Sequence, residues 1–101
     1  MKKNAISKKE LDEFEAVFFA LSHPTRRQIL FSLSQRNGSM IGGEIAKQFS
    51  CAWPTITGHL QNLENAGLVT ANKKGREQLY QINTGRLDVI ENWIDKIRGK
   101  S

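Results

Sequence analysis

The stretch from Glu44 to Gly67, EIAKQFSCAWPTITGHLQNLENAG, contains a run of side chains whose types suit contact with DNA bases. Its second half, from Trp53 on, has no acidic residue until Glu64 and offers these candidate contact residues: Trp53, Pro54, Thr55, Thr57, Gly58, His59 and Gln61. Hydroxyls and amides can bond base edges in the major groove, and a threonine methyl can meet a thymine methyl. The pattern therefore predicts a face that enters a DNA groove.

Two short helices joined by a tight turn would hold these side chains. Apolar residues recur three or four positions apart, which is the helical period: Ile45, Ala46 and Phe49 in a helix over about 44–49, then Ile56, Leu60 and Leu63 in a helix that opens near Pro54. Proline suits a first helical turn, and Gly67 suits a left-handed helix end. Helical hairpins also occur in many small domains without DNA, so the segment that follows matters.

A hairpin with a basic tip is predicted directly after these helices. Residues 68–71 and 76–82 are the expected strands, and the segment 72–75 is the expected turn, with a glycine for positive φ. Lys73, Lys74 and Arg76 gather at its end. Such lysines also protect edge strands, but beside a helix-turn-helix they favour a wing that contacts phosphate or the minor groove.

Two amphipathic helices are expected at the ends of the chain, over 8–21 and 84–98. Their apolar positions are more than one small core needs: Leu11, Phe14, Phe18, Leu87, Ile90, Trp93, Ile94 and Ile97. We expect the last helix to pair with the first across a two-fold axis, which would make a homodimer. The alternative is that both helices cover the core of one monomer.

Between these parts, a second helix is predicted from Pro24 to about Gln35, with His23 as its cap rather than as a ligand or base. Arg26 and Arg27 lie in its first turn, where the helix dipole disfavours cations. We therefore expect an internal ion pair for one of them and a surface role for the other. A very short strand is expected at residues 40–41.

Length and composition limit the protein class. A chain of 101 residues is one domain, expected over 1–101, and no apolar run approaches the roughly 18 residues of a membrane span. The basic N-terminus is not followed by the apolar segment of a signal peptide, so a cytoplasmic location is expected. The net charge of +5 lies wholly in residues 16–87, because both ends are neutral. A basic centre fits a polyanion-binding surface.

The expected order of elements is mainly helical with one small β-hairpin. The segments ALSHPTRRQIL, GEIAKQF, PTITGHLQNLENAGLV and KKGREQLYQI resemble the ArsR-type winged helix-turn-helix transcriptional regulators over about residues 14–82. The resemblance implies a homodimeric repressor that binds double-stranded operator DNA, with the Pro54 helix in the major groove. Trp53 and Gly58 depart from the small polar or basic residues common at the matching positions.

Neither metal site of the family's sensors can form here. The Cys-x-Cys position reads Ile41-Gly42-Gly43, and the last helix offers Asp88, Glu91 and Asp95 without a histidine. Soft and borderline metals need thiolate or imidazole ligands. The lone Cys51 cannot close an intrachain disulfide. We therefore predict no metal or cofactor, and no effector is indicated.

Two other function classes fit the residues less well. A winged-helix module that binds protein is the alternative, because exposed aromatics such as Trp53 mark protein contacts. An enzyme is not expected, since the chain lacks a set of nucleophile, base and orienting group.

Overall fold

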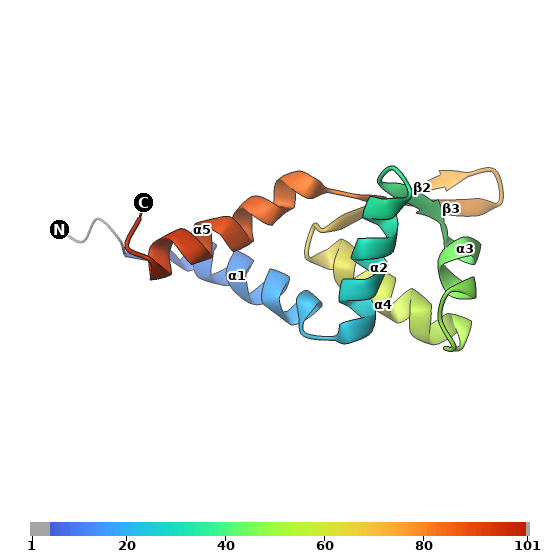
Figure 1. Cartoon of the computed structure of the whole chain (residues 1–101), viewed down its shortest axis with the longest axis horizontal. Coiled ribbons are helices and arrows are strands. Elements are labelled where there is room, and N and C mark those ends of the chain that lie inside the picture. Colours follow the sequence, from blue (N-terminus) through green and yellow to red (C-terminus); the bar gives the residue numbers. More distant parts are fainter. Residues whose placement is uncertain (1–4, 101) are drawn as a thin grey trace.

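The computed structural model describes residues 5–100 as a mainly helical chain with one small sheet (Figure 1). Its elements are α1 (Lys8–Leu21), α2 (Pro24–Gln35), β1 (Ser39–Ile41), α3 (Gly42–Lys47), α4 (Trp53–Asn65), β2 (Val69–Lys74), β3 (Glu77–Ile82), a 3-10 turn (Thr84–Leu87) and α5 (Asp88–Ile97). The predicted fold class is confirmed. Helices α1 and α5 form one end of an elongated molecule, and the β2–β3 hairpin forms the other.

Local hydrogen bonds explain where the helices begin and end. Ser7 Oγ accepts from the Glu10 N–H while Glu10 Oε1 accepts from the Ser7 N–H, which is a capping box at the start of α1. His23 Nδ1 accepts from the Thr25 N–H at 3.1 Å, so the predicted cap of α2 is confirmed. Gly67 adopts φ +78°, the left-handed conformation expected after α4. Helix α3 begins at Gly42, two residues earlier than predicted.

The sheet is antiparallel with strand order β1-β3-β2. Pairing of β2 with β3 continues to Lys74 opposite Glu77, so Gly75 and Arg76 alone make the turn. The predicted turn over 72–75 was wrong, because Lys73 and Lys74 still pair with β3 as strand residues. Gly75, at φ +64°, supplies the positive φ that a tight two-residue turn requires.

The core lies where α1, α2, α3 and α4 meet the sheet. Its fully buried side chains come from every one of these layers: Val17, Ile29, Leu33, Ile45, Ile56, Leu60, Leu63, Leu68 and Val69. The predicted stripe of α4 is among them, but of the residues predicted for α3 only Ile45 is, because Ala46 and Phe49 are only partly buried. This packing fixes α4 against α2 and β2 and leaves its other side in solvent.

Helices α1 and α5 pack against each other in the same chain. The rings of Phe18 and Trp93 meet edge to face at 5.1 Å, and Asn92 Nδ2 donates to Glu10 Oε2 at 2.9 Å. The Asn92 hydrogen bond, together with the Ser7 N–H, holds the pKa of Glu10 below its usual value. The first and last helices were expected to pair across a two-fold axis, and here they pair within one chain. We call this helix pair the arm.

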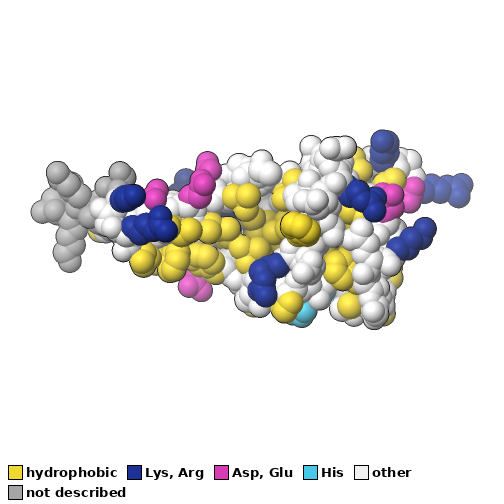
Figure 2. Space-filling view, viewed as in Figure 1, with side chains coloured by type: hydrophobic (Ala, Val, Ile, Leu, Met, Phe, Trp, Pro, Cys, Tyr) yellow, Lys and Arg dark blue, Asp and Glu magenta, His cyan; other side chains and the backbone are white. Residues whose placement is uncertain are grey.

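The arm leaves much of its apolar surface uncovered. No residue of α5 is buried, and Leu11, Trp93 and Ile97 are 48%, 37% and 67% exposed. Figure 2 shows a hydrophobic band along this end of the molecule. Phe14, by contrast, is only 4% exposed. We correct its assignment to a dimer interface, because its surface is already used inside its own chain.

Arg26 and Arg27 bind the end of α1 rather than a carboxylate. Arg26 is buried and donates from Nε to the Ala20 carbonyl at 2.6 Å and from Nη2 to the Phe19 carbonyl at 3.1 Å. Exposed Arg27 donates to the Leu21 carbonyl at 2.7 Å. Within residues 5–100 neither arginine has an ion-pair partner, so the expected internal ion pair was wrong. The negative end of the α1 dipole takes the place of the carboxylate.

Replacing Arg26 with Met should destabilise the fold by about 2 kcal/mol, because buried carbonyls lose charged donors while the apolar stem is kept. Urea unfolding followed by circular dichroism measures this. The matched control is Arg27→Met, which removes an exposed bond and should cost less than about 1 kcal/mol. Equal losses for the two variants would contradict the structural role given to Arg26.

Candidate nucleic-acid interface

Helix α4 presents one continuous polar face to solvent. Pro54, Thr57, Gly58, Gln61 and Asn65 are all exposed and recur at the helical spacing on one side. The Thr57 hydroxyl donates to the Trp53 carbonyl at 2.9 Å, and Gln61 Nε2 donates to Asn65 Oδ1 at 3.0 Å. Asn65 was missed from the sequence, although its position four after Gln61 is the signal that places it here. The face carries hydroxyl and amide groups that can bond base edges.

His59 does not belong to this face, and its predicted placement there is corrected. Its ring lies 4.4 Å from the ring of His23, and its Nδ1 is 3.3 Å from Arg26 Nη1. The side chain is part-buried between α4 and the start of α2. Burial lowers the pKa of His59, and the charges of His23 and Arg26 lower it further. His59 therefore ties α4 to the end of α1 through Arg26.

Trp53 lies at the first turn of α4 and faces the hairpin. A Cβ at position 42 would come within 2.9 Å of Trp53 Cη2 and 3.2 Å of Tyr80 Cε2, so the indole rests on the backbone of Gly42. The opposite side of the ring system remains in solvent, with the residue 48% exposed. Thr55 is also exposed, beside the main polar face. The large side chain thus joins the start of α4 to the sheet.

The tip of the hairpin is cationic. Lys73, Lys74 and Arg76 are exposed, and none of them has an ion-pair partner within the part of the chain that the structure describes. Figure 2 shows Lys and Arg side chains projecting at this end of the molecule. Figure 1 places α3, α4 and the hairpin together at the end opposite the arm. The polar helix face and the basic tip thus share one end, as a polyanion-binding surface requires.

Other kinds of site find no support in the described residues. Among residues 5–100, no three His, Cys, Asp or Glu side chains are grouped as a metal site would need. Cys51 is free and exposed. None of the helices in that range has the length and apolar character needed to cross a membrane.

The matches to known sequences agree with this geometry. Residues 23–71 match the family described as "Bacterial regulatory protein, arsR family". The transcriptional repressor SdpR of Bacillus subtilis is 40% identical over 78 residues, which cover 77% of this chain and 84% of the relative. The chain belongs to the ArsR family. An arsenical resistance operon repressor of Staphylococcus xylosus is 33% identical, with 84% of this chain and 80% of that protein covered.

Solved structures of ArsR-type proteins share the fold. A crystal structure of an ArsR family transcriptional regulator, RHA00566, superposes with a TM-score of 0.80 at 30% identity, over 94% of this chain and 93% of the other. The homodimeric winged helix-turn-helix DNA-binding domain Mb0332 of Mycobacterium bovis gives a TM-score of 0.69 at 29% identity, over 88% and 80%. This ArsR chain is thus a transcriptional regulator with a winged helix-turn-helix fold, as its sequence predicts.

The His59 contact predicts a pH-dependent stability. The fold favours neutral His59, so its contribution is complete above the unfolded pKa of about 6.5 and is lost as pH falls below that value. The midpoint of urea unfolding should therefore drop between pH 7.5 and 5.5. His59→Asn keeps an oxygen acceptor near Arg26 without titrating, so this variant should show a smaller drop. An unchanged pH dependence in His59→Asn would contradict the assignment.

Proposed function

We propose that this ArsR-family chain is a homodimeric repressor. In this proposal α4 contacts the bases of operator DNA, and the β2–β3 hairpin contacts the DNA phosphate backbone. The observation that supports this most is that one end of the molecule carries both a polar α4 face with no acid before Glu64 and a basic tip whose cations have no ion-pair partner among residues 5–100. On α4 the proposed contacts are Pro54, Thr55, Thr57, Gly58, Gln61 and Asn65, with Trp53 at the helix start. On the hairpin they are Lys73, Lys74 and Arg76. His59 supports α4 from behind.

Gly58 gives the proposed reading face a particular shape. A Cβ at this position would meet nothing within 4 Å, so packing inside the chain does not require glycine. A bare backbone at the middle of the face allows a close approach to the groove floor. The neighbouring Thr57 and Gln61 then carry the hydrogen bonds and the methyl contact that distinguish base pairs.

The arm is the proposed dimer interface. The elongated shape supports this, because the radius of gyration of the chain is 15.3 Å, against about 13 Å for a compact protein of this length. An amphipathic α5 without one buried residue leaves an apolar side that a second copy can cover. Leu11, Phe18, Trp93, Ile94 and Ile97 are the proposed contacts, whereas Leu87 and Ile90 already pack partly on their own core. The relative Mb0332 from M. bovis is homodimeric, which supports a homodimer here.

A two-fold dimer implies a near-palindromic site. Two α4 helices that enter successive major grooves on one side of the duplex need half-sites about 34–36 Å apart. We further propose that the protein acts without a metal sensor, because thiol and imidazole ligands are absent from positions 41–43 and from 84–98, and without catalysis, because its residues offer no set of nucleophile, base and orienting group. As a regulator of DNA, it is assigned to the cytoplasm.

The exposed indole of Trp53 favours a second candidate, a module that binds another protein through this end. The two functions differ in salt dependence. Binding to DNA releases counterions, so its log affinity falls linearly with log salt, whereas an aromatic protein contact changes little.

Substituting Lys73, Lys74 and Arg76 with Ala should weaken binding to all duplexes and flatten the salt dependence. The slope of log affinity against log salt should decrease by about 1 for each phosphate that the protein no longer neutralises. Fluorescence anisotropy on labelled genomic fragments at several salt concentrations measures both. Lys9→Ala on α1, at the opposite end of the molecule, is the control and should leave the slope unchanged. A protein that binds no duplex even at low salt would refute the proposed function.

Thr57→Ala with Gln61→Ala should instead erode sequence preference. Removing each base-contacting side chain should reduce discrimination between operator and unrelated DNA by about 1–3 kcal/mol, while the salt slope stays the same. Competition between the two duplexes measures this ratio. A uniform loss of affinity for both duplexes would contradict a reading role for these residues.

Ile97→Glu should convert the dimer to a monomer, because a carboxylate placed in an apolar interface loses its water. Sedimentation velocity measures the change. Phe31→Glu is the matched control, since Phe31 is similarly exposed, at 62% against 67%, but lies on α2 outside the arm. It should remain dimeric. A monomeric wild type at micromolar concentration would overturn the proposed interface.

A further inference from the structure

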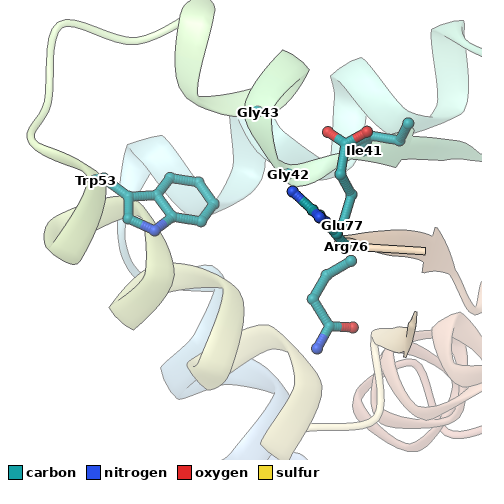
Figure 3. Close-up of a pocket in the computed structure, with 7 residues that line it drawn as sticks. Ile41, Gly42, Gly43, Trp53, Arg76 and Glu77 are labelled. Atoms are coloured by element: carbon teal, nitrogen blue, oxygen red, sulfur yellow. The ribbon is translucent and has the colours of Figure 1, made fainter. Parts of the chain in front are cut away.

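A pocket of about 250 Å³ lies between the helix-turn-helix and the hairpin. Its walls come from three separate elements: Ile41, Gly42 and Gly43 at the start of α3, Trp53 at the start of α4, and Arg76, Glu77 and Gln78 of the hairpin. Figure 3 shows the Trp53 indole on one side and Arg76 with Glu77 across from it. The pocket thus lies at the junction that holds the hairpin against α4.

The two glycines explain why this space is open. Gly42 is buried against Trp53 and Tyr80, and any side chain there would push the indole away. Gly43 is exposed, and a Cβ on it would meet nothing within 4 Å. The floor is therefore bare backbone and the wall is a half-exposed aromatic ring. Flat surfaces of this kind accept another ring by stacking or edge contact.

The polar side chains of the pocket favour a ligand with one negative charge. The side chains of Arg76 and Gln78 make no hydrogen bond or ion pair with any residue in 5–100. A guanidinium offers a planar fork that matches a carboxylate with two parallel hydrogen bonds. Glu77 also lines the pocket, and its carboxylate disfavours ligands with several negative charges. An indole wall and one free guanidinium together fit a single-charged aromatic acid.

We propose that this pocket binds a small aromatic carboxylate, with its ring on Trp53 and its carboxylate on Arg76. At about 250 Å³ the space suits one or two fused rings, since it lies below the usual range for drug-sized ligands. The occupied pocket withdraws Arg76 and the exposed indole from DNA. Ligand and operator DNA therefore compete, and each weakens binding of the other by the same factor. This competition rests on the proposed function.

The first test uses the protein alone, so it does not depend on DNA binding. Indole-3-carboxylate and benzoate are titrated into the ¹⁵N-labelled protein, and the two tryptophan indole signals are followed, with Trp53→Phe for assignment. The Trp53 signal and the Gly42 and Gly43 amides should shift saturably, while the Trp93 signal stays fixed. Uncharged indole and cyclohexanecarboxylate, which each lack one required group, should bind at least about tenfold more weakly.

Two variants test the assignment of the residues. Arg76→Gln should weaken binding of the carboxylate about tenfold or more, as expected when a charged hydrogen bond is removed. Lys73→Gln removes the same charge from the same hairpin outside the pocket and should change the ligand affinity less than about twofold. Gly43→Leu fills the space and should abolish the shifts. A folded Gly43→Leu variant, or Arg76→Gln, that binds like wild type overturns the proposal.

Failure of the site and failure of the DNA function are separable. No saturable shift of the Trp53 signal at millimolar probe, or equal binding of uncharged indole, overturns the aromatic-acid site whatever the protein does with DNA. In a second experiment, indole-3-carboxylate should lower the affinity of the wild-type protein for duplex DNA. It should leave the DNA affinity of Gly43→Leu unchanged. Binding to the pocket without any change in DNA affinity overturns the competition.

Discussion

The buried guanidinium of Arg26 is the contact on which the arrangement of this molecule depends. It reaches from the first turn of α2 to two carbonyls at the end of α1, and its third nitrogen approaches His59 of α4. The Arg26 side chain therefore joins the arm to α2 and α4. A cation there is stable because the α1 terminus offers carbonyls that α1 itself cannot use. The direction of α4 relative to the arm follows from this contact.

The elongated shape is the second constraint. Ionic and aromatic contacts hold α5 to α1, but no side chain of α5 is buried by its own chain. A helix pair with so little buried apolar surface is only weakly stable by itself. It would be stabilised by another surface that covers its exposed apolar side. Covering the arm with its copy would set the distance between two reading helices. In the proposed dimer the same surface would govern both stability and the geometry of DNA recognition.

The junction of α3, α4 and the hairpin shows how a departure from the usual family residues changes the surface. An indole at the start of α4 is accommodated only because residue 42 has no side chain. The consequence is a pocket beside the cationic tip. This junction therefore has room for the proposed aromatic acid next to the proposed DNA contacts.

The sequence by itself determined the parts that depend on near neighbours. The apolar spacing of Ile56, Leu60 and Leu63, the His23 cap and the left-handed Gly67 all follow from interactions within a few residues, and these predictions are confirmed. Tertiary structure alone decided that Arg26 binds carbonyls, that His59 turns inward to a partner 33 positions away, and that α1 and α5 pair within one chain. It also lengthened β2 to Lys74 through pairing with β3, which leaves a turn of only two residues. Helical period fixes which residues share a side, but only packing between distant segments fixes what that side meets.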